Sequence, residues 1–204
     1  MDIISTPPQA LQKFYSKLHW KVDTDEPNIY LTFDDGPTPE ITEKVLDLLK
    51  AHQAKATFFC IGKNVMANRA LFNRIVAEGH QIGNHSNSHL NGWKTKTADY
   101  VEDVMQCTEI FQSTLFRPPY GRMKKKQIKK LRKQFKIIMW SVLSMDYDET
   151  KSEVECWEIT AKQLKPGAIV TFHDSVKAEK RMLFALEKTL AMGKEKAWNF
   201  EVIE

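Results

Sequence analysis

The chain has 204 residues, of which 42% are hydrophobic and 27% charged, and its formal net charge is +4. This length and composition predict one globular domain with a sizeable buried core. No stretch approaches the roughly 18 consecutive apolar residues of a membrane-spanning helix, so an integral membrane protein is not expected.

The start of the chain and the cysteines both favour a reducing compartment. Residues 1–8 combine an early acid with two prolines and lack a basic stretch followed by an apolar block, so no secretory signal is expected. The three cysteines, Cys60, Cys107 and Cys156, are widely spaced and odd in number. That pattern argues against a disulfide framework and against a thiolate zinc site. The expected location is therefore the cytoplasm.

Strand and helix patterns alternate along the whole chain. Apolar runs predict strands over 29–35, 56–61, 81–85, a short one ending at Phe116, and then 136–142, 168–172 and 200–203. Helical spacing is found at 9–18, 38–52, 64–78, 96–112, 122–136, 152–164 and 177–191. Alternation of this kind means parallel strands joined by helical crossovers.

Both an open doubly wound sheet and a barrel satisfy this alternation. Polar clusters follow five of the seven expected strands, which favours a closed or nearly closed barrel with its site at the carboxyl ends of the strands. In an open sheet the clusters would gather near one switch point. We therefore expect a single α/β domain over 29–204 whose seven strands form a closed or nearly closed barrel. Residues 1–28 are expected to form an N-terminal segment whose short helix, with Leu11, Phe14 and Leu18, packs on one end of the core.

The positive charge is concentrated in one segment. Nine basic residues lie between Arg122 and Lys136, and no acid occurs between Glu109 and Asp146. Ile128, Leu131 and Phe135 fall on one helical stripe of this segment, so an amphipathic helix with a solvated lysine face is the preferred interpretation. Contact with an anionic polymer or a membrane surface is the alternative. No nucleic-acid partner is expected.

A metal site is predicted from residues at two strand ends. The first strand stops at the adjacent carboxylates Asp34 and Asp35, and the third is followed by His85 and His89. Two histidines and Asp35 offer nitrogen and oxygen ligands that suit Zn²⁺ or another divalent ion, with a position left for water. We expect one such ion, with Zn²⁺ favoured over Co²⁺, Ni²⁺ or Mn²⁺.

The remaining polar residues complete a hydrolytic set. Neighbouring side chains of a strand point to opposite faces, so Asp34 has a different role from Asp35. Beside an ion that lowers the pKa of water to roughly 7, Asp34 can accept the proton, and the Arg117 guanidinium can hold that carboxylate. His173 follows an apolar strand and suits a general acid, with Asp146 as the carboxylate that favours its protonated form.

Five motifs occur in order along the chain. Thr32–Pro37, His85–His89, Arg117–Gly121, Trp140–Tyr147 and Thr171–His173 resemble those of the polysaccharide deacetylases, carbohydrate esterase family 4, which contain the NodB-type homology domain. The resemblance covers about residues 29–203. It implies a distorted (β/α)₇ barrel, a divalent metal, and removal of N-acetyl groups from chitin-like or peptidoglycan sugars. It also implies that the Tyr120 backbone N–H binds the oxyanion, and that the substrate-binding positions are Pro118, Pro119, Tyr147 and Thr171.

Two motifs depart from the family pattern. The fourth has Leu143 and Tyr147 where the family has an aspartate and a tryptophan, and the fifth has Thr171 in place of a leucine. These positions shape the acetyl pocket, so they bear on acyl or sugar specificity. A metal-dependent N-deacetylase acting on an N-acetylated glycan is the predicted function. A catalytically weak homologue that binds carbohydrate or an anionic polymer is the alternative.

Overall fold

The computed structural model describes residues 7–204, so the first six residues of the expected N-terminal segment 1–28 lie outside the described part. Residues 7–204 contain eight strands: β1 (Asn28–Asp34), β2 (Ala56–Cys60), β3 (Gln81–Asn84), β4 (Leu115–Phe116), β5 (Lys136–Ile137), β6 (Val142–Leu143), β7 (Ile169–His173) and β8 (Asn199–Phe200). All their pairings are parallel, in the order β5-β4-β3-β2-β1-β7-β6, and β8 pairs with the start of β1.

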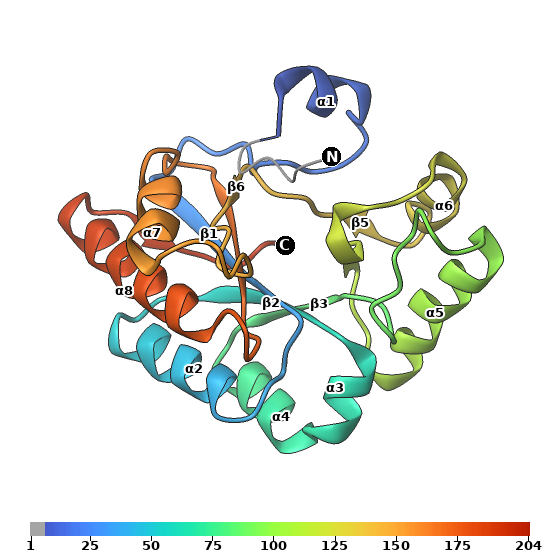
Figure 1. Cartoon of the computed structure of the whole chain (residues 1–204), viewed down its shortest axis with the longest axis horizontal. Coiled ribbons are helices and arrows are strands. Elements are labelled where there is room, and N and C mark those ends of the chain that lie inside the picture. Colours follow the sequence, from blue (N-terminus) through green and yellow to red (C-terminus); the bar gives the residue numbers. More distant parts are fainter. Residues whose placement is uncertain (1–6) are drawn as a thin grey trace.

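Helices surround these strands. They are α1 (Gln9–Phe14), α2 (Ile41–Ala51), α3 (Gly62–Ala67), α4 (Arg69–Ala77), α5 (Thr97–Ile110), the 3₁₀ turn η1 (Pro119–Gly121), α6 (Lys125–Leu131), α7 (Glu153–Ala161) and α8 (Glu179–Glu195). Figure 1 shows α2 to α8 around the outside of the strands, with α1 apart from them at the top of the view. This arrangement confirms the predicted distorted (β/α)₇ barrel.

The barrel is not closed by β5 and β6 themselves. The N-terminal segment lies in the gap between the two edges of the sheet, because His19 forms a bridge with Ile138, just after β5, and Lys21 forms one with Ala168, just before β7. The His19 N–H donates to the Ile137 carbonyl at 2.9 Å, and the Met139 N–H donates to the His19 carbonyl at 2.7 Å. The open side of the sheet is therefore bridged by residues that precede the first strand.

Three elements differ from the sequence prediction. The strand expected over 136–142 is two strands, β5 and β6, because the chain leaves β4 after Ile138 and pairs next with His19 before it reaches β7. The helix expected over 64–78 is interrupted at Asn68, whose backbone is non-helical. Helix α1 is shorter than expected and buries none of its residues, so Leu11 and Phe14 are exposed and only Leu18 is buried.

Strand alternation divides the side chains of β1 between two sides. Ile29, Leu31 and Phe33 belong to the core packed under the outer helices, where the Phe33 ring stacks on Phe58 at 4.9 Å. Tyr30, Thr32 and Asp34 point to the other side. The alternation of β1 therefore points its polar residues into the barrel and packs its apolar residues between the sheet and the outer helices.

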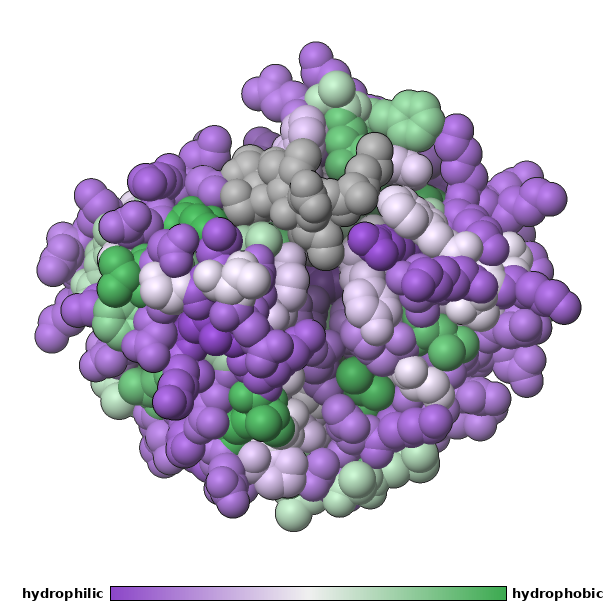
Figure 2. Space-filling view, viewed as in Figure 1, coloured by the Kyte–Doolittle hydropathy of each residue, from purple (hydrophilic) through white to green (hydrophobic). Residues whose placement is uncertain are grey.

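The basic segment forms the expected amphipathic helix. Within α6 and the turn after it, Leu131 and Phe135 are buried while the lysine side chains are exposed. Hydrophilic residues cover most of the face seen in Figure 2, which is hollowed between its two sides. Among residues 7–204, no helix has the length and apolar character needed to cross a membrane. All three cysteines are buried and unpaired.

Candidate active site

The carboxyl ends of β1 and β7 form the base of the site. Asp34 and His173 are register partners on these adjacent parallel strands. Thr32 and Thr171 pair two residues earlier, so they lie on the same inner face. Because parallel strands end at the same edge, the two titratable side chains emerge at one end of the barrel.

The turn after β1 separates the two adjacent carboxylates. Asp35 has a φ of 86°, and its carbonyl accepts a hydrogen bond of 2.7 Å from the Asn64 amide. Gly36 lies so close to Asp174 that a Cβ at position 36 would stand 2.0 Å from a carboxylate oxygen, so only glycine fits there. The Gly36 N–H donates to Asp174 at 3.0 Å. The turn therefore directs Asp35 away from Asp34 and toward β3.

Asp174 supports the site, a role that was not predicted from the sequence. It is fully buried and also accepts a hydrogen bond from the Thr42 hydroxyl. Burial raises the pKa of Asp174 to about 8. Its position directly after His173 was visible in the sequence, but its contact with Gly36 depends on the approach of β7 to β1. Asp174 anchors the turn that carries Asp35.

Asp35, His85 and His89 lie together, with one ligand atom from each within 4.8 Å of the others. The Nε2 atoms of His85 and His89 are 3.7 and 3.2 Å from an Asp35 carboxylate oxygen. His85 Nδ1 lies 2.8 Å from the Arg117 carbonyl, so the proton of a neutral ring belongs on Nδ1 and the Nε2 lone pair faces the cluster.

Both histidines are held neutral. Burial lowers the pKa of His85 well below its usual value, and the neighbouring His89 lowers it further. Burial is also the main cause of the lowered pKa of His89, opposed by Asp35 and Asp34 and reinforced by His173 and Lys177. Neutral imidazoles and a carboxylate form the ligand set of a divalent metal, and three protein ligands leave a position open. The donor chemistry fits the expected ion.

Asp34 lies beside this cluster, paired with a buried arginine. Arg117 is fully buried and its Nη1 is 2.8 Å from an Asp34 oxygen and 2.7 Å from the Thr32 hydroxyl. Its Nη2 donates to the Met139 carbonyl at 2.9 Å, and its guanidinium lies over the Phe59 ring at 4.2 Å. The Asp34 carboxylate is thereby fixed in one orientation.

His173 is held by Asp146 through both carboxylate oxygens. One oxygen is 2.7 Å from His173 Nδ1 and the other accepts the His173 backbone N–H at 2.8 Å. Burial alone would lower the pKa of His173, but the charge and hydrogen bond of Asp146 raise it to about 9. His173 is therefore protonated at neutral pH, with Asp146 on Nδ1 and Nε2 left for another group.

A cavity of about 80 Å³ joins these groups. This volume has room for a small group such as an acetamide. It is lined by Asp34, Asp35, His85, His89, Tyr120, Gly121, Trp140, Leu143, Tyr147, Thr171, His173 and Lys177. A larger cavity of about 480 Å³ lies at the opposite end of the barrel, by Tyr30 and Ile169, and contains none of these residues.

The expected substrate-binding residues have different positions. Tyr147 and Thr171 line the cavity, and the Tyr147 ring meets the His173 ring edge-on at 5.0 Å. Pro118 and Pro119 are buried behind it, where their carbonyls accept the Gly121 and Arg122 N–H groups and form the turn that presents Tyr120. The two prolines shape the loop and leave the contact surface to Tyr120.

The Thr171 hydroxyl has a partner. It is 3.3 Å from the Thr32 hydroxyl, which gives its own proton to the Val170 carbonyl at 2.7 Å. Thr171 therefore donates to Thr32, which already accepts from Arg117. The threonine that replaces the family's leucine belongs to the network that holds Asp34, and its hydroxyl is not left unsatisfied in the cavity.

Comparison with known proteins agrees with this geometry. A family model described as polysaccharide deacetylase matches residues 21–137, which is more than half of the chain. The chain belongs to the polysaccharide deacetylase family.

Individual relatives cover most of the chain. It is 33% identical to a peptidoglycan-N-acetylglucosamine deacetylase of Bacillus cereus, over 90% of each protein, and 36% identical to the peptidoglycan-N-acetylmuramic acid deacetylase PdaA of Bacillus subtilis, over 74% of this chain and 61% of that protein. The crystal structure of the Bc1960 peptidoglycan N-acetylglucosamine deacetylase with a bound N-oxidanyl-benzamide superposes with a TM-score of 0.88 at 30% identity, covering 97% of this chain and 95% of that one.

Proposed function

We propose that this protein is a metal-dependent hydrolase that removes N-acetyl groups from an amino-sugar polymer or oligomer. The observation that carries the proposal is the arrangement around the cavity: a histidine–carboxylate cluster and Asp34 on one side, and a protonated His173 on the other. A hydrolase that splits an amide needs a group that accepts a proton from water and another that gives one to the departing amine.

The metal would be held by Asp35, His85 and His89. A divalent ion in this position supplies a Lewis acid that polarises the acetamide carbonyl and lowers the pKa of water to roughly 7. His85 is oriented for this task by the Arg117 carbonyl on its Nδ1. Asp35 is oriented by the turn that Asn64 and Asp174 hold.

The proton transfers are assigned to the two strand-end residues. Asp34, fixed by Arg117, accepts a proton from the attacking water as the new carbon–oxygen bond forms. The Tyr120 backbone N–H, on the opposite loop, is proposed to bind the oxygen that becomes negative. His173 then donates its Nε2 proton to the amine nitrogen as the carbon–nitrogen bond breaks, and Asp146 stabilises the imidazolium before that step. Acetate and a free amino sugar result.

The substrate class follows from the relatives. Those described above are named for N-acetylglucosamine and N-acetylmuramic acid residues of peptidoglycan, and a Bradyrhizobium relative, 34% identical over 72% of this chain, is a chitooligosaccharide deacetylase. An N-acetylated glycan is accordingly the proposed substrate. The alternative, a catalytically weak binding homologue, is favoured only by the Leu143, Tyr147 and Thr171 departures, because every proposed catalytic and ligand residue is present.

Acetate release from a panel of N-acetylated glycans tests the proposal. Zinc-loaded protein is expected to release acetate from at least one of chitooligosaccharides and peptidoglycan glycan strands. A chelator should abolish release, and added Zn²⁺, Co²⁺, Ni²⁺ or Mn²⁺ should restore it. Loaded protein that binds a glycan but releases no acetate from any of the panel would favour the binding homologue.

A further inference from the structure

Helix α1 presents apolar side chains to solvent. The sequence predicts that it packs on the core, but it buries none of its residues, and the exposed fractions of Leu11 and Phe14 are 41% and 63%. Figure 2 shows apolar residues on the surface over α1, at the top of the view. The chain is attached just after this helix, because Leu18 is buried and His19 pairs with Ile138. Helix α1 therefore stands on a fixed base with its apolar side chains uncovered.

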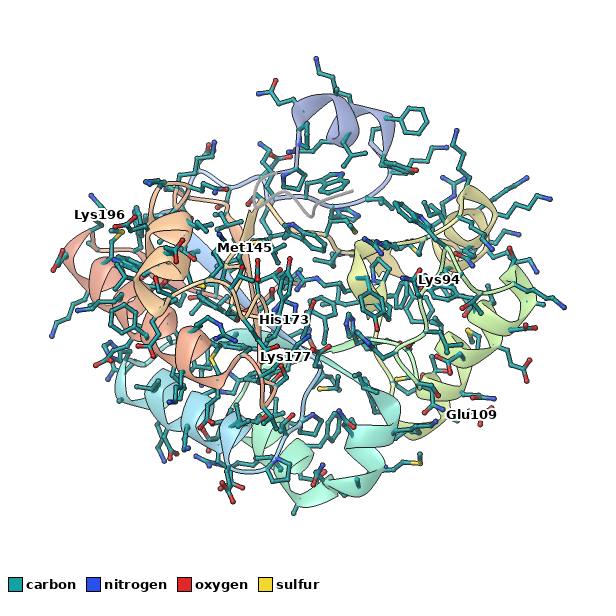
Figure 3. The ribbon with its side chains drawn as sticks, in the orientation of Figure 1. Lys94, Glu109, Met145, His173, Lys177 and Lys196 are labelled. Atoms are coloured by element: carbon teal, nitrogen blue, oxygen red, sulfur yellow. The ribbon has the colours of Figure 1, made fainter. Side chains whose placement is uncertain are left out.

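Positive charge gathers on α6 and the turn after it. Eight basic side chains are exposed between Lys124 and Lys136. Figure 3 shows side chains of α6 pointing outward from the barrel, with Glu109 at the far end of α5. Among residues 7–204, none of the eight cations forms an ion pair with a carboxylate. Like charges four residues apart destabilise a helix, and α6 has two such pairs, so an anionic partner would relieve their repulsion.

The two helices form one continuous surface. Lys125 Nζ lies 4.4 Å from the centre of the Phe14 ring, so the apolar side of α1 touches the start of α6. Residues 7–22 contain no acid, and none occurs between Glu109 and Asp146. Neither segment therefore adds a negative side chain. We define the α1–α6 surface by its exposed residues, which are Leu11, Lys13, Phe14, Lys125, Lys126, Lys129, Lys130, Arg132 and Lys133.

The mixture of charged and apolar groups distinguishes between possible partners. A soluble polyanion binds through charge and would leave Leu11 and Phe14 in water. A second copy of this chain, in a two-fold contact, would place the same lysines against each other. A bilayer with anionic lipids supplies phosphates for the lysines and, beneath them, an apolar layer for the other side chains. A helix of six residues can lie in that boundary, although it is too short to span the bilayer.

We infer that the α1–α6 surface binds the face of a bilayer that contains anionic phospholipids. Leu11 and Phe14 enter the boundary between the headgroups and the acyl chains. The lysines of α6 contact the lipid phosphates, with their aliphatic stems along the membrane surface. None of these residues lines the catalytic cavity, so this binding is independent of the proposed function.

Co-sedimentation with vesicles tests the lysines. Wild type is expected to bind vesicles of phosphatidylcholine with phosphatidylglycerol, more weakly as salt rises, and not to bind vesicles of phosphatidylcholine alone. The triple variant Lys126→Gln, Lys129→Gln and Lys130→Gln should weaken binding by about 100-fold, at about fivefold per lysine. The matched control removes three exposed lysines of α8 by Lys180→Gln, Lys188→Gln and Lys194→Gln. It should bind as wild type does. Absence of wild-type binding to the anionic vesicles would overturn the inference.

The apolar pair separates a bilayer from a soluble polyanion. Leu11→Ser with Phe14→Ser should weaken binding to the anionic vesicles by about tenfold or more, because two apolar side chains no longer leave water. Binding to polyglutamate, a soluble polyanion, should not change. Val154→Ser is the matched control, since Val154 is a 53% exposed apolar residue on α7. Equal vesicle affinities of wild type and the Leu11, Phe14 variant would overturn the inference in favour of a partner bound by charge alone.

A fluorescent label reports whether Phe14 enters the lipid. The three native cysteines are buried, so a thiol introduced by Phe14→Cys is accessible for selective labelling with a dye that brightens in an apolar medium. The labelled protein should brighten with the anionic vesicles. Lys180→Cys on α8, labelled in the same way, should not. Brightening at neither position, or equally at both, would contradict insertion of α1.

Two controls complete the test. A wild-type dimer in sedimentation that Leu11→Ser with Phe14→Ser converts to a monomer would overturn the inference, because a second copy would then cover the apolar pair. Acetate release from a soluble chitooligosaccharide should be the same in wild type and in all these variants. If wild type releases no acetate from any glycan, the proposed function fails, and the vesicle measurements still decide the inference.

Discussion

The two sides of the barrel are held together by different means. On the long-strand side, β1, β2, β3 and β7 have 7, 5, 4 and 5 residues, and continuous ladders fix their register. On the short-strand side, residues 115–147, the strands β4, β5 and β6 have two residues each. The long-strand side carries Asp34, Asp35, His85 and His173, whereas the short-strand side contributes Arg117, Tyr120, Asp146 and Tyr147.

Where the strands are short, hydrogen bonds from buried side chains add the attachment that backbone hydrogen bonds between long strands supply on the other side. Arg117 ties the short-strand side to β1 through Asp34 and Thr32 and to the segment between β5 and β6 through Met139. Asp146 ties it to β7 through the backbone and ring of His173. The residues that orient the catalytic groups are therefore also the residues that attach half of the barrel.

The largest expected effect comes from removing Arg117. Arg117→Met leaves the buried Asp34 carboxylate without its partner, and breaking a buried pair in this way costs about 3–5 kcal/mol. The free energy of unfolding, measured with denaturant, should fall by that amount, and turnover should be lost with it. Arg74→Met is the control on the long-strand side, where a surface arginine pairs with Asp47 and Glu78. It should cost less than about 1 kcal/mol.

Equal losses of unfolding free energy in the two arginine variants would remove the distinction between the two sides. Arg117→Lys sharpens the test, because it retains charge but not the fork that reaches Thr32, Asp34 and Met139 together. We expect it to recover part of the stability and little of the activity.

The next effect concerns His173, where the two sides meet. His173→Ala should slow turnover by about 10²–10⁴-fold, the usual contribution of a general acid. Metal content and glycan affinity should be retained, since the ligands lie on the other side of the cavity. His52→Ala, at the exposed end of α2, is the matched control and should behave as wild type. Normal turnover in His173→Ala would show that another group protonates the amine.

Asp146 should determine the alkaline limit of activity. With the pKa of His173 at about 9, the rate should fall as pH rises through about 9, because the acid form disappears. Asp146→Asn removes the charge that raises this pKa, so the limit should move to lower pH. The protonated pair also stabilises the fold: its contribution is complete below the ordinary histidine pKa of about 6.5 and is lost as pH rises through about 9. An unchanged alkaline limit in Asp146→Asn would contradict the assignment.

The smallest effect is expected at the two departures from the family motifs. The double variant Thr171→Leu with Tyr147→Trp should raise kcat/KM on chitooligosaccharides by about tenfold, the scale of a methylene-sized pocket change. The single changes should differ in stability. Thr171→Leu enlarges a fully buried residue of the β7 ladder and should cost about 1–3 kcal/mol. Tyr147→Trp, on the short-strand side, should cost less. No gain in kcat/KM would show that these positions do not set specificity.

The sequence predicts the long-strand side better than the short-strand side. Long apolar runs ended by polar residues indicate both a strand and the place of its last side chain, which is why Asp35, His85 and His89 could be grouped in advance. The run over 136–142 could not be resolved into β5 and β6, because an apolar stretch is equally compatible with one strand or with two joined across the gap that His19 fills.

Two residues of the site required the folded chain. Lys177 and Asp174 stand in the sequence beside His173, but a lysine near a helix start is ordinarily solvated, and an acid after a strand is ordinarily part of a turn. Only the approach of β7 to β1 brings Asp174 to Gly36, and only the contacts of Arg181 bring Lys177 over the cavity.

The central claim is that two adjacent carboxylates, Asp34 and Asp35, have different roles because the turn at Gly36 separates them. Metal content by elemental analysis, measured beside acetate release for Asp34→Asn and Asp35→Asn, tests it most directly. We predict that Asp34→Asn retains one ion per chain without turnover, and that Asp35→Asn loses both the ion and turnover. Full metal content in both variants, or normal acetate release from Asp34→Asn, would contradict the account.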